Sequence, residues 1–93
     1  MPPRVSELVF TDAAPGKLGA RRISLDEATQ LLRNGSVLAA NRRGVADGRW
    51  LLFGRTNGGR YLTLVIEATV DPTIWLVITG WDSTQVERKM LDR

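Results

Sequence analysis

Two arginines, Arg55 and Arg60, flank a short turn and are well suited to bind an anion. Between them, Asn57-Gly58 predicts a two-residue β-hairpin of type I′, because both central residues of that turn need a positive φ. In that register Arg55 faces Arg60 directly, and two guanidinium groups so placed repel each other. A carboxylate of the protein or a bound phosphate would relieve the repulsion. The alternative is that both side chains extend into water.

The residue types that the chain lacks narrow its chemistry. Without cysteine it has no disulfide, no thiol nucleophile and no thiolate metal site, and without histidine it lacks the commonest general acid or base and the commonest zinc ligand. Any catalysis therefore relies on arginine, lysine, carboxylate, tyrosine or hydroxyl groups. We expect no metal ion and no cofactor.

The composition predicts one small globular domain, since 93 residues with 43% hydrophobic and 25% charged side chains can form a single core. A net charge of +3 permits nucleic acid or an acidic protein as partner, although solubility alone also explains it. All basic residues except Lys17 and Lys89 are arginine, which binds phosphate at two points; codon usage in a GC-rich genome is the other explanation for the many arginines.

Because the sequence contains neither a bilayer-spanning apolar run nor a signal-peptide core, we expect a cytoplasmic protein without membrane contact.

The N-terminal segment, residues 1–21, is expected to be irregular and to dock weakly on a single domain formed by residues 22–93. It contains one short predicted strand at 5–10, followed by a loop at 11–19 that is rich in glycine and holds Pro15.

The first helix start is predicted at Ser24-Leu25-Asp26-Glu27, which has the form of a capping box. Ala28, Leu31 and Leu32 then form an apolar face, and Asn34-Gly35 predicts the helix end.

Strands are predicted after this helix, at residues 37–40, 49–56, 60–68 and 73–79. The last three carry large apolar residues on both faces, so one face is expected to be covered by helix and the other to be partly covered or used for binding. A second helix is predicted to start at Asp82 or Ser83, with Gln85 completing a variant capping box. The expected architecture is α+β: an antiparallel meander packed with an early helix and a C-terminal helix.

Three segments together resemble the BrnT-type toxins of the RelE/ParE-like superfamily of bacterial toxin–antitoxin modules. They are the aromatic strand Trp50–Arg55, the strand Arg60–Ile66 after the glycine turn, and the strand-to-helix junction Ile78–Arg88. The resemblance covers roughly residues 22–91. It implies a RelE/ParE-like fold, cleavage of mRNA or ribosome-associated RNA without a metal, and inhibition by a cognate antitoxin through which the pair binds operator DNA. This chain departs from the family at Trp81, where an arginine is usual, and at Leu91, where an aromatic residue is often found.

Metal-free RNA cleavage needs a base for the 2′-hydroxyl, cations for the charged transition state and an acid for the 5′-oxygen. Arg55 and Arg60 are the predicted cations. Glu67, Asp82 and Glu87 are candidate bases, of which Glu87 is retained as catalytic, although a helix-cap role explains Asp82 and an arginine pair would explain Glu87.

The remaining candidate residues would bind RNA. Trp81 would stack on a base, unless it simply packs against the C-terminal helix. Cationic side chains would contact the phosphates; these are Arg42, Arg43, Arg49, Arg88 and Lys89. The functional hypothesis is therefore a growth-inhibiting endoribonuclease toxin. The alternative is a non-catalytic module on the same fold that binds RNA or protein, or represses transcription together with an antitoxin.

Overall fold

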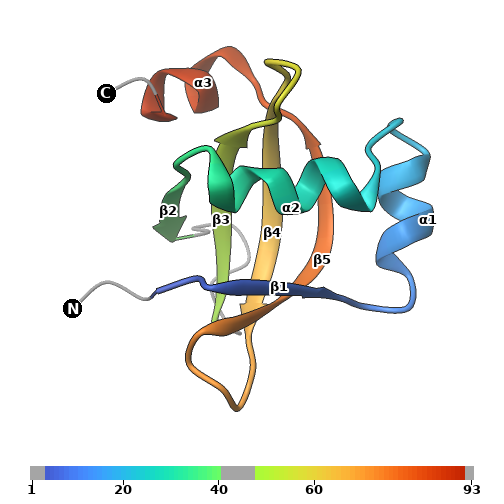
Figure 1. The fold of residues 1–93 in the computed structure, drawn as a ribbon, viewed down its shortest axis with the longest axis vertical. Coiled ribbons are helices and arrows are strands. Elements are labelled where there is room, and N and C mark those ends of the chain that lie inside the picture. Colours follow the sequence, from blue (N-terminus) through green and yellow to red (C-terminus); the bar gives the residue numbers. More distant parts are fainter. Residues whose placement is uncertain (1–3, 41–47, 92–93) are drawn as a thin grey trace.

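The computed structural model describes residues 4–40 and 48–91. Within these residues a five-stranded mixed β-sheet with three helices around it forms an α+β domain (Figure 1). Its elements, in chain order, are β1 (Glu7–Phe10), α1 (Ala14–Gly19), α2 (Leu25–Arg33), β2 (Val37–Ala40), β3 (Arg49–Arg55), β4 (Tyr61–Ala68), β5 (Ile74–Asp82) and α3 (Gln85–Leu91).

The sheet has the order β1-β5-β4-β3-β2, and its last four strands in sequence form the predicted antiparallel meander. The first strand differs from the prediction, because β1 pairs with β5 in parallel and makes the sheet mixed. Two parallel strands can pair only if a long crossover joins them, and here the chain from α1 to β4 is that crossover. The pairing places Leu8, only 7% exposed, in the core beside Trp75.

The segment at residues 11–19 was predicted to be a loop, and this prediction is wrong. Its residues include the short helix α1, which has Pro15 in the first turn, where a missing N–H does no harm. Ala14 and Leu18 are completely buried, so the helix is held by packing that glycine and proline signals cannot reveal. The indole Nε1 of Trp75 also donates to the Arg4 carbonyl at 3.1 Å. From Arg4 to Leu18 the N-terminal segment is thus packed against the sheet and its core.

The predicted capping box of α2 is confirmed. The amide of Glu27 donates to Ser24 Oγ and the amide of Ser24 donates to Glu27 Oε1, both at 3.0 Å. Gly35 has a φ of +76°, a value that favours glycine, just after the helix. Ala28 and Leu31 are buried against the sheet.

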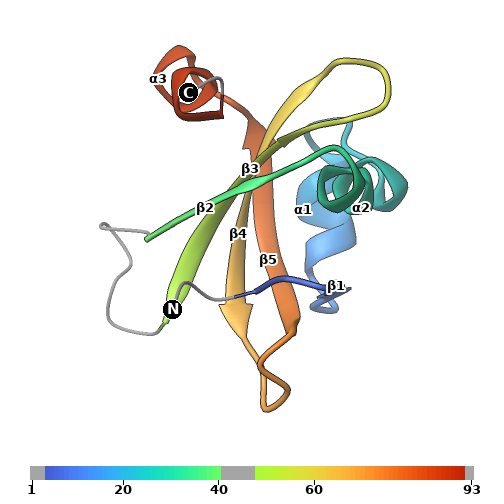
Figure 2. The same ribbon diagram turned by 60° about the vertical axis from the view of Figure 1, so that its left-hand side comes forward.

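The two faces of the sheet are covered differently (Figure 2). Helices α1 and α2 lie on one face (Figure 2), and their buried residues Leu18, Ala28 and Leu31 belong to the hydrophobic core cluster. Helix α3 lies on the opposite side, at the end where the β3–β4 hairpin turns, and it contacts β3. Even on this second face Phe53, Thr63 and Val65 are buried.

The β3–β4 hairpin has a longer turn than predicted. The Thr56 carbonyl accepts from Gly59 N at 3.0 Å, Thr56 N donates to the Arg60 carbonyl at 2.8 Å, and Gly59 has a φ of +87°. This is a three-residue loop with glycine at a bulge, not a type I′ turn. The shift by one residue pairs Arg55 with Tyr61, so the predicted Arg55–Arg60 pair does not exist.

The start of the C-terminal helix also differs from the prediction. Strand β5 continues to Asp82, and α3 begins only at Gln85. The cap is Thr84, whose Oγ1 accepts from Glu87 N at 3.3 Å, while Thr84 N donates to Glu87 Oε1 at 2.8 Å. The predicted Asp82 cap is wrong because that carboxylate is bonded to Arg60.

Candidate functional site

Two arginines from different elements meet at one tyrosine ring near the hairpin turn. Arg55 and Tyr61 are direct cross-strand partners, and the Arg55 guanidinium carbon lies 5.7 Å from the ring centroid. Arg88 reaches the same ring from α3, with its guanidinium carbon 4.5 Å from the centroid. Both distances allow a cation–π contact. We call Arg55, Tyr61, Trp81, Glu87 and Arg88 the hairpin-end site.

Within this site Glu87 is fixed by several donors. Its Oε1 accepts from the Thr63 hydroxyl at 3.0 Å, from Trp81 Nε1 at 3.1 Å and from the amide of Thr84 at 2.8 Å. From the residues that the structure describes, its Oε2 accepts only a longer bond of 3.4 Å, donated by Trp81 Nε1. The carboxylate therefore has one anchored oxygen and one oxygen that keeps capacity for a further hydrogen bond. The same contacts hold the half-buried Trp81 against α3.

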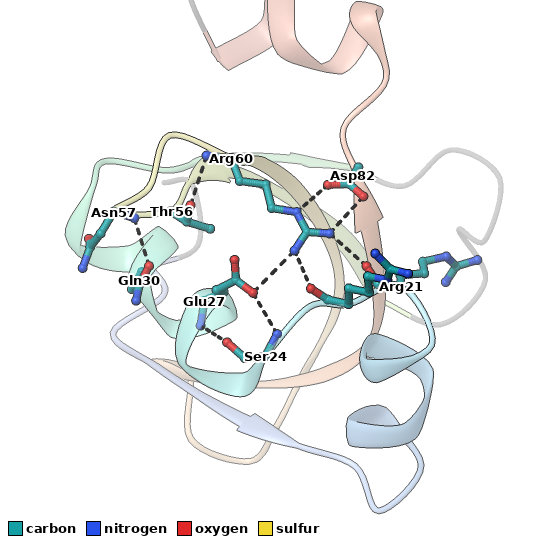
Figure 3. Close-up of polar contacts among 9 residues, drawn as sticks. Arg21, Ser24, Glu27, Gln30, Thr56, Asn57, Arg60 and Asp82 are labelled. Atoms are coloured by element: carbon teal, nitrogen blue, oxygen red, sulfur yellow. Dashed lines mark hydrogen bonds and ion pairs between the residues drawn. The ribbon is translucent and has the colours of Figure 1, made fainter.

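Arg60 lies elsewhere, between the sheet and α2 (Figure 3). Its Nε and Nη2 donate to the two carboxylate oxygens of Asp82 at 2.6 Å and 3.0 Å. The other donors reach the carbonyls of Arg21 and Arg22 and, at 3.4 Å, Glu27 Oε1. This guanidinium is therefore committed to ion pairs within the protein. The protein carboxylate anticipated from the sequence as a partner is Asp82.

These ion pairs shift the pKa values of the groups around Arg60. The hydrogen bond from Arg60, with its positive charge, lowers the pKa of Asp82. The pKa of Glu27 is lowered first by the backbone amide of Ser24 and also by Arg60. The bond to Asp82 in turn raises the pKa of Arg60. All three groups are thus held in their charged forms.

The other candidate residues do not all converge on the hairpin-end site. Arg49 begins β3, about 20 Å along the strand from Arg55, and forms an ion pair of 3.4 Å with Glu67. Lys89 is exposed on α3 next to Arg88. Arg42 and Arg43 lie outside the described residues.

Among the residues that the structure describes, no group of three or more histidine, cysteine or acidic side chains is arranged to hold a metal ion. In the same part of the chain, no helix has the length and apolarity needed to cross a membrane. Comparison with known proteins found no matching family model, curated protein or solved structure.

Sequence reasoning missed two features of the site. The motif Thr84-Gln85-Val86-Glu87 is itself a capping box and could have predicted both the helix start and the fixed position of Glu87. The approach of Arg88 to Tyr61 had no such signal, because it depends on how α3 turns back over the sheet.

Proposed function

We propose that this chain is the toxin component of a bacterial type II toxin–antitoxin module and cleaves RNA without a metal ion. The observation that carries the proposal is the approach of Arg55 and Arg88 to one ring, that of Tyr61, at 5.7 Å and 4.5 Å. Within the described residues, neither guanidinium donates a hydrogen bond to another side chain or carbonyl. Both therefore keep their donors for an RNA phosphate.

Each residue of the hairpin-end site has one role in this mechanism. Arg55 and Arg88 bind the scissile phosphate and stabilise the charge that develops on it. Glu87, anchored through Oε1, accepts the 2′-hydroxyl proton on Oε2. The Tyr61 hydroxyl donates a proton to the leaving 5′-oxygen. Trp81 offers its indole for stacking on a neighbouring base.

Arg60 has no catalytic role in this mechanism. Its donors are used by Asp82, Glu27 and two backbone carbonyls, so a phosphate would have to displace them. Arg88 takes the place that the sequence had suggested for Arg60. The proposed site therefore still has two arginines and one carboxylate, namely Arg55, Arg88 and Glu87.

The biological setting belongs to the same proposal. A RelE/ParE-like toxin would act in the cytoplasm on mRNA or ribosome-associated RNA, and a cognate antitoxin would inhibit it and carry the operator-binding domain. An α+β domain with cations gathered at one end of its sheet is compatible with this role.

A second candidate function is a non-catalytic module that binds RNA or protein. The contacts of Glu87 favour this function, since its carboxylate completes a helix cap and accepts bonds from Thr63 and Trp81. These structural roles account for a glutamate at this position without any catalysis. In that case Arg55 and Arg88 would bind a phosphate or an acidic partner without cleavage.

Induced expression in a bacterial host tests the proposal. We would compare the wild type, Arg55→Ala/Arg88→Ala and the matched control Arg4→Ala/Lys17→Ala, following growth and the integrity of total RNA. The control removes the same charge from exposed positions on β1's flank and on α1. Growth arrest with RNA cleavage in the wild type and control, both lost in the site variant, is expected. Normal growth and intact RNA with soluble, folded wild type would reject the nuclease and favour the binding module.

A further inference from the structure

An open cleft of about 420 Å³ lies between the end of α2 and the β3–β4 hairpin. Its volume falls in the range of small-ligand sites, about 300–1,000 Å³. The residues that line it are Asn34, Arg55, Thr56, Asn57 and Gly59. Arg55 belongs both to this cleft and to the hairpin-end site, so the two lie next to each other. A nucleic-acid strand bound at Arg55 could therefore occupy both.

The two asparagines of the cleft hold each other in one orientation. Asn34 Nδ2 donates to the Arg55 carbonyl at 2.8 Å and to Asn57 Oδ1 at 3.0 Å. These bonds leave Asn34 Oδ1 as an acceptor and Asn57 Nδ2 as a donor. Among residues 4–40 and 48–91, neither of these two atoms has a hydrogen-bond partner. Two side chains that line the cleft thus carry one such amide donor and one such amide acceptor.

The backbone around these amides is also held in place. The amide of Asn57 donates to Gln30 Oε1 at 2.9 Å, which fastens the turn to α2, and the Asn57 side chain points away from Arg60 (Figure 3). Gly59 lines the cleft with no side chain, and a Cβ placed there would meet nothing within 4 Å. The polar groups are therefore fixed before any ligand enters, which lowers the entropic cost of binding.

We propose that this cleft binds one unpaired adenine of single-stranded RNA. The inference rests on the proposed function, because the adjoining phosphate would be the one bound by Arg55 and Arg88. Asn57 Nδ2 can donate to N7 of adenine, and Asn34 Oδ1 can accept from the N6 amino group beside it. An unpaired base in RNA leaves both of these atoms accessible. The hairpin-end site supplies affinity for the backbone, and the cleft supplies the preference for a base.

Fluorescence anisotropy with end-labelled octanucleotides r(A)8 and r(U)8 tests this inference on the full chain. For the wild type we expect r(A)8 to bind about tenfold more tightly than r(U)8, a typical discrimination for an amide–adenine pair. Asn57→Ala removes the donor and should bring the two dissociation constants together. Asn57→Asp keeps the oxygen that accepts from Asn34 but replaces the amide donor by a second oxygen. It should therefore also bring the ratio of the two dissociation constants to about one. Its negative charge acts on both oligonucleotides and does not enter this ratio. Arg88→Ala should weaken binding of both oligonucleotides and leave their ratio unchanged.

The possible outcomes separate the two proposals. Equal binding of r(A)8 and r(U)8 by the wild type, or an unchanged ratio in folded Asn57→Asp, would overturn the adenine site and leave RNA binding at the hairpin-end site standing. If the folded wild type binds neither oligonucleotide, RNA binding itself is rejected and the adenine site with it. If Arg88→Ala changes the ratio and Asn57→Ala does not, base selection lies at the hairpin-end site and the cleft is not a base site.

Discussion

Arg60 and Asp82 form a two-point ion pair, with Nε 2.6 Å from Oδ1 and Nη2 3.0 Å from Oδ2. The same guanidinium bonds the carbonyls of Arg21 and Arg22 and approaches Glu27 of the α2 capping box. One side chain thus joins β5 to the α1–α2 turn and to α2. Arg22 has a positive φ of 58°, unusual for a residue other than glycine, and its carbonyl is one of these acceptors.

Replacement of Arg60 by alanine should lower stability without removing the proposed RNA contacts. We expect a loss of about 1–2 kcal/mol, because several charge-assisted bonds disappear but Asp82 remains accessible to water. The melting temperature should fall by about 5–10 °C. Arg33→Ala, an exposed change on α2, is the control and should stay within about 0.5 kcal/mol of the wild type. A stable Arg60→Ala protein that no longer binds RNA would instead show that Arg60 contacts the ligand.

The contribution of Arg60 should depend on pH. The pKa values of Asp82 and Glu27 are lowered in the folded protein, so both carboxylates stabilise it at any pH above their pKa values in the unfolded chain, near 4. This stabilisation is lost as the pH falls through the lowered pKa values of the folded protein. Urea unfolding at pH 7, 4 and 3 should therefore show the gap between wild type and Arg60→Ala narrowing as the solution becomes more acidic. A gap that stays constant would contradict this linkage.

Two glycine-to-alanine changes should have opposite effects. A Cβ at Gly54 would lie 2.6 Å from Leu31 Cγ and 3.0 Å from Leu31 Cβ, so Gly54→Ala must push α2 from the sheet. We expect a loss of about 1–3 kcal/mol. Gly16 lies in α1 with open space around it, and Gly16→Ala should stabilise the protein by about 0.5–1 kcal/mol. Chemical denaturation measures both. A destabilised Gly16→Ala protein would argue against a folded α1.

Glu87→Gln separates catalysis from structure at the hairpin-end site. The amide oxygen can still accept the bond from Thr84 that completes the capping box, so stability should change little. A general base is lost, however, and purified protein should cleave RNA at least about 100-fold more slowly. Glu87→Ala should in addition lower stability by about 1 kcal/mol, since the side chain that accepts from the Thr84 amide, the Thr63 hydroxyl and Trp81 Nε1 is removed. Undiminished cleavage by Glu87→Gln would assign Glu87 a purely structural role.

Local sequence patterns predicted much of the fold because neighbouring residues alone determine those features. The serine–glutamate pair at 24 and 27, the glycine at 35 and the apolar strands of the meander each carry their signal within a few residues. The capping box formed by Thr84 and Glu87 also lies within four residues of sequence, but Asp82 is a residue type that caps helices just as well. Only the ion pair with Arg60, 22 residues away, decided between them.

The sequence by itself determined an α+β domain with an antiparallel meander and a turn at Asn57-Gly58, since hydrophobic period and turn chemistry are short-range. Tertiary structure decided which arginines meet. The turn has one residue more than expected, and it is held by the bond that the Asn57 amide donates to Gln30 and the bond that Asn57 accepts from Asn34. This extra residue pairs Arg55 with Tyr61, and Arg60 pairs with Asp82 instead. Strand pairing turns a one-residue shift into a change of neighbour for every side chain. The parallel β1, the packing of α1 and the approach of Arg88 likewise depend on contacts between segments far apart in the chain.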